Sequence, residues 1–376
     1  CSCMHEIWKA EAAARAPFIV SEPVTAEPRL YTDYSGLTMN GNEIFAIKKG
    51  HETVPEIVRI DDDGKEQRIT RFGYETGHLN YSERFGRLYW SESMTDERWS
   101  MKTVSRIRYV NVDGGGKKSL TDDTHLLYNP SLDKDNVRTA TVQYHPEGGS
   151  SLAVVNTITG EEILTAKAPE GLQLVETAWI GDDVYATAVS DEGYGIYLFR
   201  DGVWSTVLDP QPVMVKDFRS HGNQLMFTCD KTGVNELYHL DPMTGDLRQK
   251  TVTRYGAEDF VYSRDGRWLY YTSQTMNGKK IFRTPVDSLV DRKASFSERH
   301  SWYLADKLAE QEKEIAKSEG YKAAVEDIKT DISRPEKYRK LPHAFNLHSW
   351  APFYVNVDNI MNMSFDYTWQ AASLGA

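Results

Sequence analysis

The sequence is poor in cysteine, in basic runs and in long apolar stretches. Its 376 residues include three cysteines, Cys1, Cys3 and Cys229, from which neither a disulfide framework nor a zinc-site spacing follows. A formal net charge of -11 without any basic run argues against nucleic acid and anionic membrane surfaces as partners. No stretch approaches the roughly 18 apolar residues of a membrane-spanning helix.

Motifs of the common catalytic classes are missing as well. The chain has no G-x-S-x-G nucleophile elbow, no P-loop and no dinucleotide-binding fingerprint. His5 and Glu6 begin a zinc-peptidase-like pattern, but the second histidine would have to stand where Lys9 is. We therefore predict no catalytic residue, no metal site and no cofactor.

The chain does contain a repeated pattern of strands and turns, which is clearest in Asp259–Val286. Three strands rich in aromatic and β-branched residues alternate there with tight turns that carry Gly266 and Gly278. Three strands alone cannot bury both faces, so the stretch implies similar neighbours. The predicted strands are Asp259–Ser263, Trp268–Ser273 and Ile281–Val286.

The pattern recurs six times between Leu30 and Phe296, at the period of roughly 40–50 residues that is typical of propeller blades. We predict an all-β fold: a six-bladed β-propeller with an N-terminal helix, a C-terminal surface helix and an extended or β tail. A two-sheet sandwich is the alternative, but it does not predict one unit repeated six times. The first five units are Leu30–Phe72, Gly73–Thr121, Asp122–Ala166, Lys167–Pro210 and Gln211–Thr253.

The outer strand of the sixth unit is weak in sequence. Either Lys293–Phe296 supplies it, or Phe18–Val20 does so from the N-terminal side and closes the ring. The second arrangement would cover an exposed sheet edge.

The chain divides into four predicted parts. Residues 1–29 hold a helix, Met4–Arg15, and a connector; residues 30–296 form the propeller; residues 297–334 form a charged helix and linker; residues 335–376 form the tail. We expect a fragment of a longer protein, in which Cys1 is either a truncation point or a lipidated residue.

One repeat motif resembles that of a known family. The segment Gly233–Tyr238, followed by Asp241 and Thr244-Gly245, resembles the repeat of TolB-like six-bladed propellers of the WD40-like type. The turn Ser263–Gly266 is similar to the S-x-D-G turn of the same repeat, and Ser119–Thr121 resembles its closing element. The resemblance implies the fold, but this fold hosts scaffolds, peptidase gates and lyases alike.

The tail carries a second resemblance. Tyr338–Tyr354 is similar to the segment that joins a TolB-like propeller to an outer-membrane barrel in large proteins of Bacteroides-type bacteria. Apolar and polar residues alternate in Ser364–Leu374, as in a transmembrane barrel strand, although an ordinary amphipathic strand has the same pattern. The barrel interpretation implies an outer-membrane or periplasmic location, with the barrel strands missing downstream.

The most distinctive loop is Trp90–Lys102, which joins the second and third predicted strands of its blade. Loops on a rigid scaffold tolerate variation and often carry binding residues, and arginine and tryptophan often anchor interfaces. Alternatively, Trp90 belongs to the core and Arg98 pairs locally. Histidines in the corresponding loops of two other blades share this face. The predicted partner-binding residues are Asp96, Glu97, Arg98, Trp99, His51 and His145.

Three functions are compatible with these features. The first is a monomeric, non-catalytic interaction or scaffold domain of a larger cell-envelope protein, which binds a protein or other envelope component at the loop face. The alternative is an accessory propeller that gates a peptidase domain outside this chain. The third is an enzyme with its site in the central funnel, and convergence of three or more histidine or carboxylate side chains there within metal-ligand distance would contradict the non-catalytic interpretation.

Overall fold

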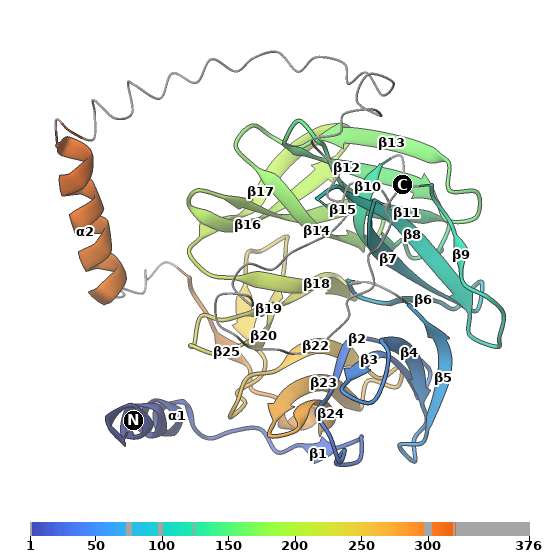
Figure 1. The fold of residues 1–376 in the computed structure, drawn as a ribbon, viewed down its shortest axis with the longest axis horizontal. Helices are drawn as coiled ribbons and strands as arrows, with labels where there is room; N and C mark the ends of the chain where they lie inside the picture. Colours follow the sequence, from blue (N-terminus) through green and yellow to red (C-terminus); the bar gives the residue numbers. More distant parts are fainter. Residues whose placement is uncertain are drawn as a thin grey trace, which may run out of the picture. The chain divides into compact units, whose positions relative to one another are not determined.

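The computed structural model describes residues 2–72, 77–96, 101–122, 125–296, 303–318 and 320. Its strands form six antiparallel sheets arranged as blades around a central axis (Figure 1). The first strand of each blade is the innermost, and these inner strands contact one another from blade to blade. The predicted all-β, six-bladed propeller is therefore confirmed.

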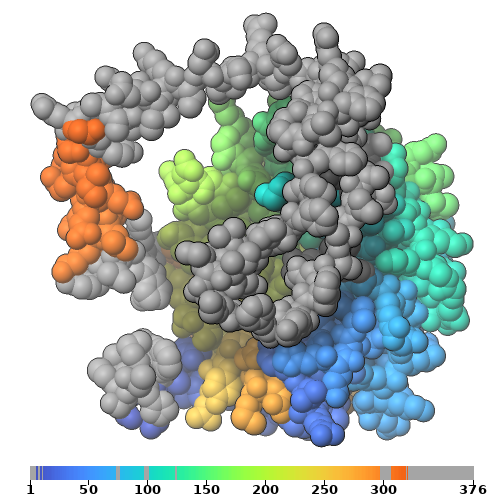
Figure 2. Space-filling model, viewed as in Figure 1, coloured from blue at the N-terminus to red at the C-terminus, as the bar shows by residue number. Residues whose placement is uncertain are grey.

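Each blade is a meander, because tight turns bring every strand back beside the preceding one. Figure 2 shows the blades following one another around the ring in chain order, from blue through green to orange. Blade 1 contains β2 (Thr32–Asn40), β3 (Glu43–Gly50), β4 (Glu56–Ile60) and β5 (Glu66–Arg71). Blade 2 contains β6 (Asn80–Ser82), β7 (Arg87–Thr95), β8 (Thr103–Asn111) and β9 (Lys118–Ser119). Blade 3 contains β10 (Leu126–Leu132), β11 (Arg138–Tyr144), β12 (Ser150–Asn156) and β13 (Glu162–Lys167).

The remaining three blades follow the same plan, with one additional strand in blade 5. Blade 4 contains β14 (Gln173–Ile180), β15 (Asp183–Ser190), β16 (Gly193–Arg200) and β17 (Val203–Gln211). Blade 5 contains β18 (Val215–His221), β19 (Gln224–Cys229), β20 (Glu236–Leu240), β21 (Leu247–Gln249) and β25 (Arg292–Lys293). Blade 6 contains β22 (Glu258–Tyr262), β23 (Trp268–Thr275), β24 (Gly278–Pro285) and β1 (Glu22–Pro23).

The N-terminal segment supplies the outer strand of blade 6. β1 pairs with β24, and a backbone hydrogen bond of 2.8 Å from Val24 to Ile281 continues the contact. The strand lies in the predicted connector and not in Phe18–Val20, because Ile19 instead bonds the Val252 carbonyl of the preceding segment. The alternative that Lys293–Phe296 completes blade 6 is wrong, since β25 pairs with β21 of blade 5.

The core lies between the blades. In the described part of the chain, six clusters of buried apolar side chains each join two neighbouring blades. Phe45 and Trp90 pack between blades 1 and 2, and Tyr185 and Phe227 pack between blades 4 and 5. Trp90 is fully buried, which confirms its alternative assignment to the core. Each blade thus buries both of its faces, which explains why no single unit is stable alone.

Two α-helices and one short 3-10 turn are described besides the strands. α1 (Ser2–Arg15) begins two residues before the predicted helix and ends shortly before Pro17, and Arg15 donates to the Thr253 and Arg254 carbonyls at 3.0 and 3.1 Å. A short 3-10 turn, η1 (Val286–Ser288), follows β24. α2 (Tyr303–Lys317) belongs to a separate unit, Ser301–Ala376, and the predicted tail lies outside the described residues. None of the helices that the structure describes has the length and apolarity to cross a membrane.

Candidate functional site

Bulges in the inner strands introduce polar side chains into the centre of the propeller. The pairing register shifts within β2, β10, β14, β18 and β22. The backbone has positive φ at Gly36, Asn129, Asp217 and Asp259, a conformation that asparagine and aspartate adopt more readily than most residues. A bulge bends its strand and re-aims a side chain, so these positions can turn toward the axis.

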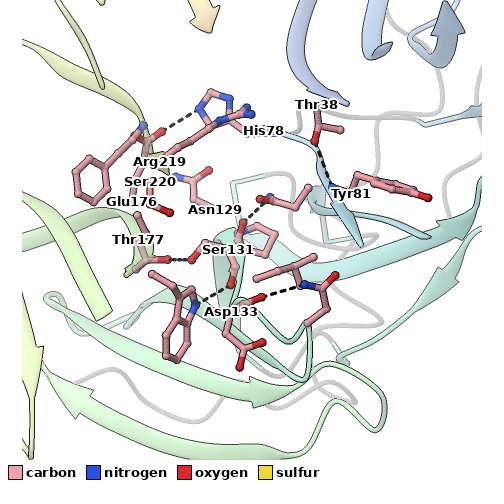
Figure 3. A pocket seen from close by; sticks show the side chains of 17 residues that line it. Thr38, His78, Tyr81, Asn129, Ser131, Asp133, Glu176, Thr177, Arg219 and Ser220 are labelled. Atoms are coloured by element: carbon pink, nitrogen blue, oxygen red, sulfur yellow. Dashed lines mark hydrogen bonds and ion pairs between the residues drawn. The ribbon is translucent and has the colours of Figure 1, made fainter. Parts of the chain in front are cut away.

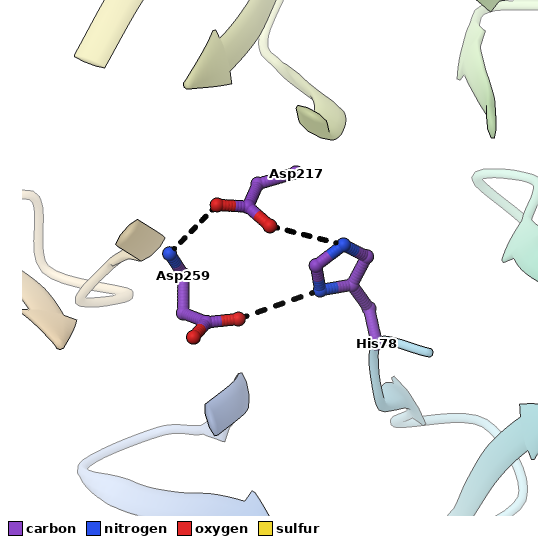
Figure 4. Close-up of side chains that lie close together, drawn as sticks. All are labelled: His78, Asp217 and Asp259. Atoms are coloured by element: carbon purple, nitrogen blue, oxygen red, sulfur yellow. Dashed lines mark hydrogen bonds and ion pairs between the residues drawn. The ribbon is translucent and has the colours of Figure 1, made fainter. Parts of the chain in front are cut away.

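Four side chains meet across the axis, and we call them the channel ring: His78, Glu176, Asp217 and Asp259. They come from blades 2, 4, 5 and 6, with His78 two residues before β6. His78 Nε2 lies 3.1 Å from Glu176 Oε1 and 3.2 Å from Asp217 Oδ1. His78 Nδ1 lies 3.5 Å from Asp259 Oδ1, so the imidazole stands between two aspartates (Figure 4).

The aspartates of the channel ring also accept hydrogen bonds that tie blades together. Asp217 Oδ2 accepts bonds from the Thr228 hydroxyl at 2.7 Å and from the Asp259 backbone N–H at 3.0 Å. Asp259 accepts bonds from the Thr272 hydroxyl at 3.0 Å and the Gly36 backbone N–H at 2.8 Å. Each aspartate therefore bonds within its own blade and to the next blade in the ring.

Glu176 bonds in the same way, because its Oε2 accepts the Phe218 backbone N–H of blade 5 at 2.8 Å. The three carboxylates thus link blade 4 to blade 5, blade 5 to blade 6, and blade 6 to blade 1. Backbone donors at the bulges are satisfied in this way even though the sheet ladder is interrupted there.

The groups of the channel ring perturb one another electrostatically. Burial opposes protonation of His78, but hydrogen bonds to Asp259 and Glu176 and the charge of Asp217 raise its pKa to about 10. Burial and the neighbouring charge of Asp259 raise the pKa of Asp217. Burial also favours neutral Asp259, but the hydrogen bond to His78 and the charges of His78 and Arg219 outweigh it and lower that pKa.

A cavity of about 220 Å³ adjoins the channel ring (Figure 3). Side chains of blades 1 to 5 line it, and they include His78 and Glu176 of the channel ring. The lining also includes Asp133 and Asn136 from the turn that follows β10. The cavity therefore lies toward the end of the propeller where the inner strands finish.

Most polar groups of the cavity wall are bonded to neighbouring blades. The Ser131 and Thr177 hydroxyls lie 2.7 Å apart, and Trp179 Nε1 donates to the Ser131 carbonyl at 3.1 Å. Arg219 Nη1 donates to the Leu37 carbonyl at 2.7 Å, whereas Nη2 is buried and has no hydrogen-bond partner in the part of the chain that the structure describes. A buried guanidinium donor beside a cavity is a place where a ligand oxygen would gain a hydrogen bond.

The predicted binding residues lie in other places. His51, Asp96 and His145 stand in or at loops between second and third strands, at the opposite end of the strands from the cavity. His51 stacks on Tyr31, with ring centroids 5.6 Å apart, and His145 Nε2 lies 2.8 Å from the Ser151 hydroxyl. Glu97, Arg98 and Trp99 lie outside the described residues.

The predicted loop is also shorter than Trp90–Lys102. β7 runs through Thr95 and β8 begins at Thr103, so only residues 96–102 connect the two strands. Asp96 pairs with Lys102 at 3.1 Å, and its backbone N–H bonds the Lys102 carbonyl at 2.8 Å. The apolar and aromatic residues assigned to the start of the loop belong to the strand.

The sequence interpretation missed the channel ring, although a signal for it existed. Asp217-Phe218 and Asp259-Phe260 repeat one dipeptide at a spacing of 42 residues, which is one blade period. The histidines give no such signal, because His78 has no histidine counterpart in the ring. A search for carboxylates at the blade period would have identified the two aspartates.

Comparison with known proteins shows the fold. No protein-family model matches the chain, and no curated protein matches its sequence. The tricorn protease is similar at 13% identity and a TM-score of 0.50, over 73% of this chain and 27% of its own. A TolB-type protein from Agrobacterium tumefaciens matches at 11% identity and a TM-score of 0.49, over 61% of this chain and 83% of its own. The propeller domain of the Trilobed protease from Pyrococcus furiosus matches at 12% identity and a TM-score of 0.46, over 71% of this chain and 97% of its own. This chain is thus a six-bladed β-propeller, and the part of it that matches the tricorn protease is similar to that protein in fold.

Proposed function

We propose that this propeller is a non-catalytic binding module that takes a carboxylate of a partner protein into the cavity beside the channel ring. The carboxylate is an acidic side chain or a chain end. The observation that carries the proposal is the buried Arg219 Nη2, which has no hydrogen-bond partner among the described residues and belongs to a residue of the cavity wall. Arginine pairs well with carboxylates because its planar donors match the two carboxylate oxygens.

The cavity is a better candidate than the predicted loop face. It is concave and lined mainly by polar side chains, with Trp179 and Leu132 beside them, and converging polar groups of this kind can fix the orientation of a ligand. His51 and His145 offer two separate positions on different blades, with local contacts. The loop residues 97–99 stay a prediction for partner binding.

A gating role is the second candidate, and one observation weighs against it. His78 of blade 2 contacts carboxylates of blades 4, 5 and 6, so the channel ring spans the axis. A peptide that passed through the channel would have to break these contacts. The cavity is then better explained as a blind pocket than as an entrance.

The convergence of His78, Asp217 and Asp259 meets the geometric condition that we set for a funnel enzyme. The non-catalytic part of the proposal therefore depends on the bonding of the carboxylates. Both aspartates accept a threonine hydroxyl and a backbone N–H, which is the bonding of structural groups and leaves little freedom for acid–base catalysis.

We further propose that the module belongs to a larger protein of the cell envelope, in the periplasm or at the outer membrane. The support is the resemblance of the repeat to TolB-like propellers and the resemblance of Tyr338–Tyr354 to a barrel-joining segment. Fractionation of cells that express the full-length gene product, with an antibody to the propeller, tests the location. Recovery in the cytoplasmic fraction would contradict it.

Binding of peptides tests the function. We expect fluorescently labelled peptides with a free carboxylate to bind more tightly than their amidated counterparts, as measured by fluorescence polarisation. Ser220→Trp should abolish this binding, because Ser220 is an exposed residue of the cavity wall and a large side chain there would obstruct the cavity.

Replacement of residues 97–101 by a short Gly-Ser linker is the control, and it should leave the affinity unchanged. If the linker variant loses binding and Ser220→Trp does not, the loop face is the partner surface. If free and amidated peptides bind equally, the role of Arg219 is refuted.

A further inference from the structure

We propose that the channel ring binds one divalent transition-metal ion, of the kind represented by Zn²⁺ and Mn²⁺. His78, Asp217 and Asp259 each offer one ligand atom, and these atoms lie within 4.8 Å of one another. Glu176 adds a carboxylate oxygen 3.1 Å from His78 Nε2. One imidazole and two or three carboxylates form a donor set that suits these ions.

The charge balance of the channel ring favours such an ion. Glu176, Asp217 and Asp259 are three carboxylates in a largely buried site. His78 and Arg219 are positive partners of Asp259. A bound ion would displace the proton that His78 shares with the carboxylates, and a divalent ion together with the Arg219 guanidinium would then balance the three negative charges. Buried charges are costly unless they are paired or coordinate a metal.

The surroundings offer both access and support for an ion. His78 and Glu176 line the cavity, so an ion can reach the ring from that side, and the His78 side chain is 20% exposed. Threonine hydroxyls and backbone N–H groups already hold the aspartates in place. Such bonds to ligating carboxylates orient them for metal binding.

Other titratable clusters in the described residues lack this combination. Glu258 is paired with Lys216 at 2.6 Å and also with Lys279, so its charge is already compensated. His239 bonds the Gln224 side chain and the Tyr262 hydroxyl, and its other close ring neighbour is His221. Within the described residues, that histidine pair is the main competing site for an added metal, and the test has to distinguish it.

Isothermal titration calorimetry of the metal-free full chain tests the proposal. We expect Zn²⁺ or Mn²⁺ to bind with one ion per chain, and Ca²⁺ to bind more weakly because an imidazole ligand suits it poorly. His78→Gln and Asp259→Asn should weaken the affinity by at least about 10–100-fold. His239→Gln and Glu236→Gln, which change a buried histidine and a buried carboxylate outside the ring, should leave the affinity unchanged.

A spectroscopic measurement of the metal ligands in the unmodified chain tests the proposal even if a variant of the channel ring fails to fold. X-ray absorption of the Zn²⁺ complex of the unmodified chain should show one imidazole nitrogen among oxygen ligands. Absence of one-to-one binding, two or more imidazole ligands, or loss of binding in His239→Gln alone would overturn the proposal. Metal binding is measured without a peptide, so this result is independent of the proposed partner site.

Discussion

Glu236 offers a pH-dependence of stability that can be worked out from the structure. The residue lies in β20 and is fully buried. It accepts hydrogen bonds from the Thr251 hydroxyl at 2.7 Å, and from the Thr253 backbone N–H and hydroxyl at 2.7 and 3.0 Å. Burial raises its pKa from 4.5 to about 7, and these hydrogen bonds, with the charge of Arg15, offset only part of the effect.

The direction of the effect follows from this raised pKa. Below pH 4.5, both the folded and the unfolded chain carry a protonated Glu236, and its contribution to stability is complete. As the pH rises from 4.5 to about 7, the unfolded chain loses the proton first, so the folded state becomes relatively less stable. The pKa difference corresponds to a loss of up to about 3 kcal/mol in the free energy of unfolding.

Glu236→Gln removes the titration while keeping a polar group of similar size. We expect the difference in unfolding free energy between wild type and variant to change by up to about 3 kcal/mol between pH 4.5 and 8, in favour of the variant at high pH. Urea unfolding at a series of pH values measures it, because other titrating groups are common to both proteins. Glu162→Gln, at an exposed position of β13, is the control. Parallel profiles for wild type and Glu236→Gln would refute the reasoning.

Three further predictions concern stability. Burial lowers the pKa of His239 to about 3, so the wild type should lose stability as the pH falls from 6.5 toward 3, and His239→Gln should lose less over the same range in urea titrations. Gly278→Ala should lower the melting temperature more than Gly266→Ala. Both glycines have positive φ, but a Cβ at Gly278 would lie 2.2 Å from the Thr32 carbonyl oxygen, whereas nothing lies within 4 Å at Gly266. If the two variants have the same melting temperature, the close approach of Gly278 to Thr32 does not determine the loss of stability. Deletion of residues 2–23 removes β1 and leaves the edge of β24 unpaired, so the chain should melt earlier and self-associate in light scattering; an unchanged monomer would contradict the role of β1 in ring closure.

Much of the architecture was predictable because it depends on local patterns. Aromatic and β-branched runs separated by glycine turns predict short strands, and their repetition predicts identical sheets that must stack. In the stretch Asp259–Val286, the predicted strands agree with β22, β23 and β24 to within three residues at their ends. The closure of the ring was harder to predict, because β1 has only two residues and therefore shows no periodic pattern.

The candidate site was not predictable in the same way. His51, Asp96 and His145 were selected for their chemical type and their place in loops, whereas His78 was one of several scattered histidines. Its importance depends on contacts with three carboxylates from blades 4, 5 and 6. No local pattern in the sequence predicts that these side chains come together with His78.

The sequence alone was sufficient for the number of blades, because at least three consecutive strands of each blade, with their turns, come from one contiguous unit. The tertiary structure decided where ring closure occurs, which side chains reach the axis and at which end the cavity lies. These features depend on contacts between residues such as His78 and Asp217, which are far apart along the chain and become neighbours only when six blades close around one axis.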